Sequence, residues 1–188
     1  MKNFLRSTIS RIFRFVLAIA IIYVCMVFYL MLSERRIAFP KAIKHKEARE
    51  AVSDTTIVKK VNCKISDDIT LEGFFAKKEN LPTILYFPDS DEDAAQFIAE
   101  TQSSKNISRL AFNYRGSGEN KGTPSEENFM TDALQIANCA KTLSPTLIYA
   151  GRGIGAIAVT KVRENNPLVL IDPKESFAEK ILRSFFYH

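Results

Sequence analysis

The residues whose types and spacing could do chemistry lie in two glycine-rich segments. The first runs from Tyr114 to Glu127 and reads YRGSGENKGTPSEE. The second, GRGIG over residues 151–155, follows an apolar run and precedes a helical pattern. A tight turn between a strand and a helix presents the first backbone amides of the helix to the outside, where they can hold an anion. We therefore expect an anion site at the amides of Ile154 and Gly155.

Alternating strands and helices are expected to position both segments. Short apolar runs bounded by turn residues predict strands, and apolar residues at helical spacing predict helices. The expected strands are residues 56–61, 70–75, 82–87, 108–113, 146–150 and 168–171, and the expected helices are residues 92–102, 124–143 and 154–163. This order predicts an α/β fold, in which helices cover both faces of a mostly parallel sheet.

The helix over residues 124–143 has the clearest start signal. Thr123 is expected as its N-cap, with Pro124 at the first helical position. Glu126, three residues after the cap, would complete a capping box. The first glycine-rich segment therefore ends where this helix begins.

The charge of the chain is concentrated at its N-terminus. The 188 residues carry a formal net charge of +5. Residues 1–14 contain no acidic residue and four basic ones, Lys2, Arg6, Arg11 and Arg14. A net basic charge is the usual electrostatic footprint of nucleic-acid binding, but here almost all of it lies in this tail beside an apolar run, and residues 15–188 are close to neutral. We expect no nucleic-acid partner.

An apolar run of 18 residues, FVLAIAIIYVCMVFYLML over residues 15–32, follows this basic tail. As a helix rising about 1.5 Å per residue it nearly crosses a hydrocarbon core about 30 Å thick. No Ala-x-Ala-like cleavage site follows the run, which favours an uncleaved transmembrane anchor over a signal peptide. We expect residues 33–54 to form a juxtamembrane linker and residues 55–188 to form the folded domain.

The lipid bilayer is thus the first expected partner, in a plasma membrane or an inner membrane. Basic residues flank the apolar run on both sides, with four before it and five just after it (Arg35, Arg36, Lys41, Lys44 and Lys46). The positive-inside rule therefore discriminates little between the two orientations. We favour the one with a cytoplasmic N-terminus.

No metal site is expected from the cysteines or from the acidic residues. The three cysteines lack metal-ligand spacing and are expected to be small buried apolar residues: Cys25, Cys63 and Cys139. Four acids approach the spacing of a calcium loop: Asp89, Asp91, Asp93 and Glu100. Ala94 stands where such a loop needs glycine, so we expect these acids to stabilise a helix N-terminus instead.

The two glycine-rich segments together resemble the membrane-anchored, serine-aminopeptidase-like branch of the α/β-hydrolases. Members of that branch carry a YRGxGxSxGxPSE segment and, at the end of the next strand, a GRSxGG nucleophile elbow. The resemblance covers about residues 69–173 and implies an α/β-hydrolase fold limited to the first six strands. In the family, the catalytic acid and histidine follow the sixth strand, so the resemblance implies a truncated domain.

Departures from the family pattern imply that the catalytic machinery is degenerate. Gly153 stands at the centre of the elbow, residues 151–155, where the family has its nucleophilic serine. The only histidines are His45, in the expected linker, and His188, the last residue. We therefore expect an inactive protein, either a pseudoenzyme or a gene remnant, with no cofactor and with an empty pocket beside Gly153. The alternative is an active serine-type hydrolase of esters or peptides whose site a partner chain completes.

The loop after the third expected strand departs from the family as well. PDSDE, over residues 88–92, replaces the HGxxG that forms the family's oxyanion loop. Its carboxylates are expected to surround the elbow: Asp89, Asp91, Glu92 and Asp93. Negative charge at this place opposes the stabilisation of an oxyanion.

A second alternative is a dinucleotide-binding module. Gly151, Gly153 and Ala156 follow a strand and open a helix, and Asp172 ends the next strand 21 residues after the first glycine. In such a fingerprint the helix N-terminus holds the pyrophosphate and the acid holds a ribose hydroxyl. It leaves the first glycine-rich segment without a role.

The last expected strand, Leu168 to Ile171, would lie at a sheet edge in a domain of six strands. A continuous apolar edge strand invites pairing with another chain. We expect that residues 175–186 cover it, that a second copy or partner chain pairs with it, or that the chain is a decayed remnant of poor stability.

Overall fold

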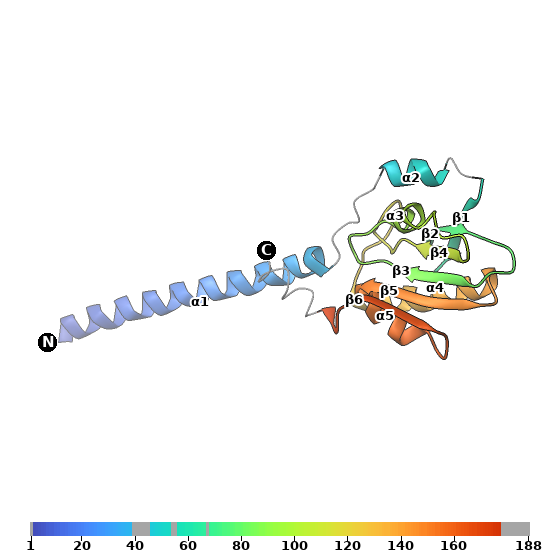
Figure 1. Ribbon diagram of the computed structural model, residues 1–188. Helices are drawn as coiled ribbons and strands as arrows, with labels where there is room; N and C mark the ends of the chain where they lie inside the picture. The colour runs from blue at the N-terminus through green and yellow to red at the C-terminus, as the bar shows by residue number, and fades with distance from the viewer. Residues whose placement is uncertain (1, 39–45, 54–55, 67, 178–188) are drawn as a thin grey trace. The chain divides into compact units, whose positions relative to one another are not determined.

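The computed structural model describes residues 2–38, 46–53, 56–66 and 68–177 (Figure 1). Contacts divide the chain into two units, residues 1–36 and 37–188. The first unit consists of most of one helix, and the second holds a sheet with its covering helices.

Helix α1, Lys2–Ala38, contains the apolar run. Its stretch Arg11–Ser33 has 23 residues and a mean hydropathy of 2.8, and large apolar side chains along it are exposed. At about 1.5 Å per residue this stretch is about 35 Å long, which is enough to cross a membrane. The helix begins in the expected basic tail and continues into the first residues of the expected linker.

Helix α2, Lys46–Ser53, also lies in the stretch expected to be a linker, but it belongs to the second unit and packs against α3, Ala94–Glu100. Val52 is 3% exposed and joins the apolar cluster on one face of the sheet. Arg49 Nε donates to Asp93 Oδ2 at 2.7 Å, and its guanidinium lies 5.7 Å from the centre of the Phe74 ring. The folded unit therefore includes an element before residue 55.

Within the described residues the sheet has six strands, in the order β1-β2-β4-β3-β5-β6. Their bounds are β1 Val58–Lys64, β2 Thr70–Ala76, β3 Thr83–Phe87, β4 Ser108–Phe112, β5 Leu147–Gly153 and β6 Leu168–Pro173. The pairs β3–β4, β3–β5 and β5–β6 are parallel, whereas β2 pairs antiparallel with both β1 and β4. The expected mostly parallel α/β sheet is confirmed, with an antiparallel end at β1 and β2.

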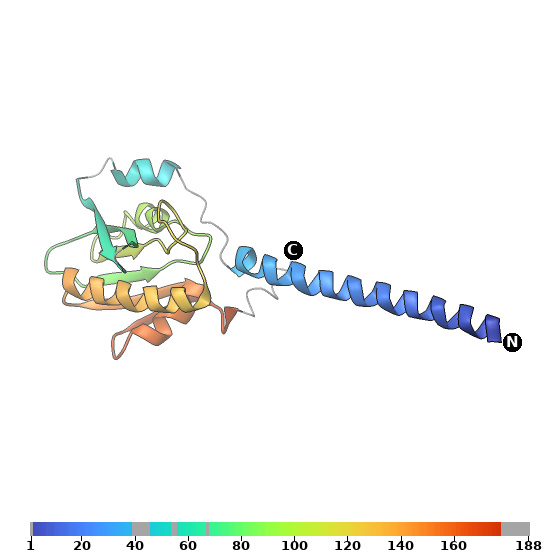
Figure 2. The same ribbon diagram turned by 180° about the vertical axis from the view of Figure 1, so that it is seen from behind.

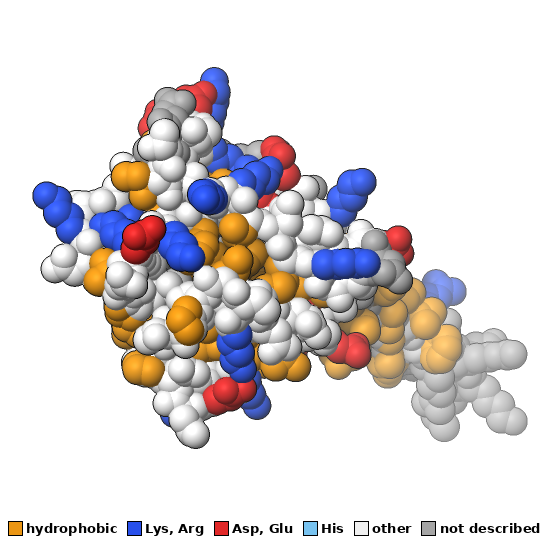
Figure 3. Space-filling model, turned by 90° about the vertical axis from the view of Figure 1, so that its right-hand side faces the viewer, with side chains coloured by type: hydrophobic (Ala, Val, Ile, Leu, Met, Phe, Trp, Pro, Cys, Tyr) orange, Lys and Arg blue, Asp and Glu red, His pale blue; other side chains and the backbone are white. Residues whose placement is uncertain are grey.

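Helices cover both faces of the sheet, as Figures 1 and 2 show from opposite sides. Helices α4, Glu126–Leu143, and α5, Ile154–Val162, lie on one face over a large apolar cluster that includes Leu85, Phe112 and Tyr149. Helix α3, Ala94–Glu100, lies with α2 on the other face over a smaller cluster. On the face drawn in Figure 3, Lys and Arg side chains are scattered among uncharged and hydrophobic ones.

Predictions about the start of α4 and about the cysteines were wrong. The N-cap of α4 is Ser125 and not Thr123, because the Ser125 hydroxyl accepts from the Asn128 amide at 3.2 Å and the helix begins at Glu126. Pro124 therefore precedes the helix, and Glu126 is the first helical residue, so the expected capping box of Thr123 and Glu126 does not form. Cys63 of β1 and Cys139 of α4 form a disulfide, with Cα atoms 5.9 Å apart, instead of packing as free apolar side chains. Cys25, in α1, is free and exposed.

Among the strands that the structure describes, β6 lies at the edge of the sheet, as expected. Val169, Leu170 and Ile171 are 41–46% exposed. Residues 178–186, which include most of the segment expected to cover this edge, lie outside the described residues. Pairing of this edge with a second chain stays a prediction.

Candidate functional site

The elbow joins the end of β5 to the start of α5. Gly153 is buried and has φ +54° and ψ −118°, a backbone conformation that residues with a side chain rarely adopt. Gly155, in the first turn of α5, lies against the backbone of Phe87 at the end of β3, so closely that a Cβ atom there would overlap the Phe87 carbonyl. Glycine at 153 allows the turn, and glycine at 155 allows the helix to approach the neighbouring strand.

The carboxylate of Asp89, from the loop after β3, lies at the N-terminus of α5. Asp89 Oδ1 accepts hydrogen bonds from the Ile154 amide at 3.2 Å and from the Ser90 amide at 2.7 Å. A Cβ atom placed on Gly153 would lie 2.6 Å from Asp89 Oδ1 and still closer to Oδ2. The space beside Gly153 is therefore occupied by this carboxylate, where the sequence suggested an empty pocket.

Glu92 holds the same loop in place. The Asp89 amide donates to Glu92 Oε2 at 2.9 Å, and the Tyr86 hydroxyl donates to the same oxygen at 2.8 Å. Arg152, within the elbow, pairs with Glu92 Oε1 at 2.7 Å. The loop after β3 and the end of β5 are thus joined by an ion pair as well as by Asp89.

Two buried tyrosines complete the surroundings of Asp89. Burial, reinforced by Glu92, raises the pKa of Tyr86, whose ring stacks on Phe97 with centroids 4.0 Å apart. Burial, reinforced by the charge of Asp89, raises the pKa of Tyr114 well above its ordinary value. The Tyr114 hydroxyl donates to the Pro88 carbonyl at 2.9 Å. Both tyrosines are therefore neutral hydrogen-bond donors that position the loop.

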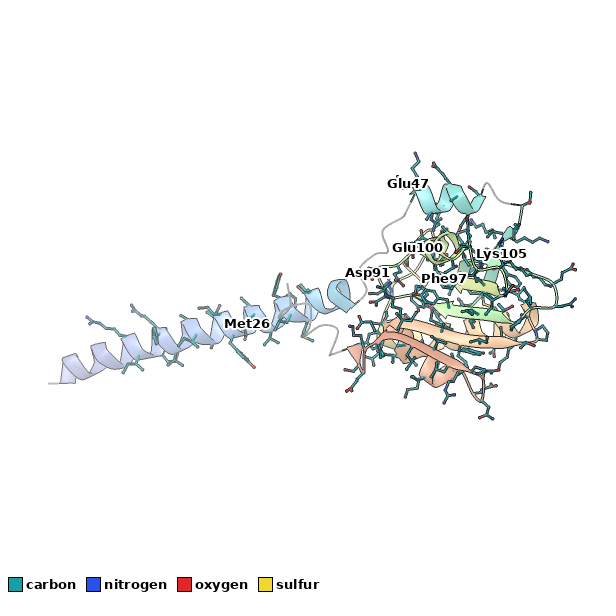
Figure 4. All side chains as sticks on the ribbon, in the orientation of Figure 1. Met26, Glu47, Asp91, Phe97, Glu100 and Lys105 are labelled. Carbon is teal, nitrogen blue, oxygen red and sulfur yellow. A yellow bond between two sulfur atoms is a disulfide. The ribbon has the colours of Figure 1, made fainter. Side chains whose placement is uncertain are left out.

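The other acids of the loop do not surround the elbow. Asp93 is fully buried, caps α3 through the Ala95 amide and pairs with Arg49. Asp91 is exposed (Figure 4). Glu100 accepts from Gln96 on its own helix. Among the residues that the structure describes, no group of three or more His, Cys, Asp and Glu side chains could hold a metal ion.

The first glycine-rich segment connects β4 to α4 through side-chain contacts. Arg115 makes a two-pronged ion pair with Asp132 of α4, with Nε–Oδ2 at 2.7 Å and Nη2–Oδ1 at 2.5 Å. Gly116, Gly118 and Gly122 all have positive φ, which fits a chain that turns repeatedly between β4 and α4. This segment therefore ties β4 to α4 and supports the loop through Tyr114. The Arg115–Asp132 pair was missed because its partners lie on different elements.

The residues of the dinucleotide alternative are not arranged around an open site. The Ile154 amide, where a pyrophosphate would bind, donates to Asp89. Asp172 is exposed on β6 and pairs with Lys174 at 2.8 Å. Gly151 and Ala156 are buried. This geometry does not support dinucleotide binding.

Comparison with protein-family models and with curated proteins finds no match. Solved structures do match. An α/β hydrolase from Vibrio vulnificus superposes with a TM-score of 0.57 at 20% identity, covering 76% of this chain and 55% of that one. The esterase Pf2001 of Pyrococcus furiosus gives 0.59 at 17% identity, covering 79% of this chain and 60% of that one.

A third match, the α/β hydrolase GrgF from Penicillium sp. sh18, has a TM-score of 0.50 at 16% identity, covering 62% of this chain and 46% of that one. The chain thus has an α/β-hydrolase fold, as the two glycine-rich segments predicted. It spans about half to three fifths of the length of these solved relatives. In this fold a strand-to-helix turn at the end of a parallel strand carries the nucleophile, and Gly153 occupies such a turn.

Proposed function

We propose that this chain is a single-pass membrane protein whose hydrolase-fold domain, of the serine-aminopeptidase-like branch, is a pseudoenzyme. Acyl transfer by an α/β-hydrolase needs a nucleophilic side chain on the elbow and amides that hold the oxyanion. Gly153 supplies no nucleophile. The observation that carries the proposal is the position of Asp89, whose negative charge lies at an amide that would stabilise the oxyanion.

Acyl transfer also needs a general base. The two histidines of the chain, His45 and His188, both lie outside the residues that the structure describes. A partner chain could bring an imidazole or a carboxylate to the elbow. It could not bring a hydroxyl to the Cα of Gly153, so the alternative of a partner-completed serine hydrolase needs a nucleophile from elsewhere, such as Ser90.

Helix α1 is the proposed membrane anchor. Its Arg11–Ser33 stretch has the length and hydropathy of a span. We place the N-terminus in the cytoplasm and the domain on the other side of a plasma or inner membrane, because the domain contains the Cys63–Cys139 disulfide. Disulfides persist in oxidising compartments and are rare in the cytosol.

The test of inactivity uses the full-length chain in detergent micelles. We expect no turnover of short acyl esters or aminoacyl arylamides, and no labelling by a fluorophosphonate, because Gly153 has no hydroxyl to attack either reagent. An active serine esterase in the same detergent serves as the control. Labelling that Ser90→Ala or another single serine substitution abolishes would refute the pseudoenzyme and identify the displaced nucleophile.

The test of anchoring is extraction of membranes with alkaline carbonate. The full-length chain should stay in the pellet, and a chain lacking residues 1–36 should be released. Release of the intact chain would mean that α1 does not span the bilayer.

A further inference from the structure

The carboxylate of Asp89 accepts hydrogen bonds from two backbone amides that belong to different parts of the fold. One is the amide of Ile154, the residue after the elbow glycine, and the other is the amide of Ser90 in the loop after β3. In an active α/β-hydrolase, the amide after the nucleophile and an amide from the loop after the third strand together form the oxyanion hole. Here the same pair of positions binds one carboxylate oxygen of the chain itself.

The second carboxylate oxygen takes the place of the missing side chain. An added Cβ atom on Gly153 would overlap Asp89 Oδ2 and would come within 2.6 Å of Oδ1. The group therefore fills the position of the elbow side chain as well as that of the oxyanion. A carboxylate is the chemical class that suits this place, because the N-terminus of α5 favours negative charge.

The loop keeps the carboxylate pointed at the elbow. The amide of Glu92 donates to the Asp89 carbonyl at 3.1 Å, and the Asp89 amide donates to the Glu92 side chain at 2.9 Å, so the two residues close a reciprocal turn. Arg152 ties Glu92 to the elbow at 2.7 Å. Asp89 itself is only partly buried, so small solutes can reach its position.

We infer that Asp89 is an internal ligand of the degenerate oxyanion hole, which it closes against external anions. The inference rests on the proposed function, since it takes Gly153 as the former position of the nucleophile. It differs from the proposed function because it concerns which group binds the amides of Ser90 and Ile154. It implies that a free carboxylate binds at the elbow only after the side chain of Asp89 has been removed.

The experiment is chemical rescue of Asp89→Ala in the full-length chain in detergent micelles. Melting temperatures are measured by near-ultraviolet circular dichroism in sodium formate and in sodium chloride of equal ionic strength. We expect Asp89→Ala to melt about 4 °C or more below the wild-type chain in chloride, because two amides lose their acceptor. Formate should recover at least half of that loss, since its carboxylate fits the vacated position.

Asp91→Ala is the matched control, because it removes the same charge from an exposed position of the same loop. It and the wild-type chain should respond to formate as they do to chloride. Equal responses of Asp89→Ala to formate and chloride would overturn the inference, and so would an unchanged melting temperature in chloride.

Asp89→Asn provides a second test that does not depend on the alanine variant folding. It keeps an oxygen acceptor without the charge, so it should melt below the wild-type chain and gain nothing from formate beyond the effect of chloride. A melting temperature equal to that of the wild-type chain would overturn the inference. The two proposals have independent tests. Fluorophosphonate labelling would refute the pseudoenzyme, whereas the melting temperatures test only whether Asp89 binds the amides of Ser90 and Ile154.

Discussion

Restoring a serine to the elbow is expected to destabilise the domain. Gly153→Ser places a side chain where φ is +54°, at a cost of about 1–3 kcal/mol for backbone strain. Its Cβ would also overlap the Asp89 carboxylate, and relieving that overlap costs about 1–3 kcal/mol more. The sum is about 2–6 kcal/mol, which lowers the melting temperature of a domain of about 150 residues by about 5 °C or more.

The part of this cost that belongs to Asp89 is measured by a double-mutant cycle. Gly153→Ser is introduced into the wild-type chain and into Asp89→Ala, and each free energy of unfolding is obtained by urea denaturation. In the Asp89→Ala background only the backbone strain remains, so the serine should cost about 1–3 kcal/mol less there. Gly153→Ala is the control for the hydroxyl, and it should behave as serine does because the overlap involves Cβ.

Two results would refute this reasoning. Gly153→Ser could melt at the wild-type temperature, which would show both that the turn accepts a side chain at φ +54° without strain and that the space beside Gly153 is empty, as the sequence alone suggests. The serine could instead cost the same in both backgrounds, which would show that Asp89 does not occupy that space. Neither serine variant should gain esterase activity, because a hydroxyl without a base to accept its proton is a poor nucleophile.

Three further predictions concern the rest of the domain. When the chain is denatured without reductant, it should show one reactive thiol, that of Cys25, and after reduction it should show three. The double substitution Cys63→Ala and Cys139→Ala should lower the free energy of unfolding by about 2–5 kcal/mol. A count of three thiols before reduction would exclude the disulfide. Arg49→Met should cost about 3 kcal/mol in urea denaturation, because it leaves fully buried Asp93 without its cation, whereas Lys46→Met, at an exposed pair, should cost less than about 1 kcal/mol. Equal costs would mean that α2 is not held by Arg49. Stability should also fall as the pH rises above about 10. The unfolded chain then ionises tyrosines that the folded chain keeps neutral because burial raises their pKa: Tyr86, Tyr114 and Tyr149. The stability that these neutral tyrosines contribute is complete below about pH 10 and is lost as the pH approaches their pKa in the folded chain. Tyr114→Phe should therefore make the unfolding free energy depend less steeply on pH above about 10. An unchanged slope would contradict the burial of the Tyr114 hydroxyl.

The order of the elements followed from local patterns. The apolar runs and helical spacing predicted each of the six strands and the helices α3, α4 and α5, because strands and helices have different periods that are visible within a few residues. Helix α2 was missed because its eight residues are mostly polar, and it is held by Arg49 and Val52 against distant parts of the chain. The N-cap of α4 was misplaced by two residues, since Thr123 and Ser125 carry equivalent caps and only the path of the preceding loop selects between them.

By itself the sequence determined that the elbow carries no hydroxyl, because a missing side chain at Gly153 needs no coordinates to establish. It also determined the apolar length of α1 and the glycines that permit the turn at the end of β5. Only the tertiary structure decided where the acids of the loop after β3 point. Asp89 and Ile154 are 65 residues apart and meet because β3 and β5 pair in parallel, which brings the carboxyl ends of both strands to the same edge of the sheet. No local pattern encodes that contact. The four acids, which are close together in the sequence, therefore have four different environments: Asp89 lies at the elbow, Glu92 pairs with Arg152, Asp93 is buried as a helix cap, and Asp91 is exposed to solvent.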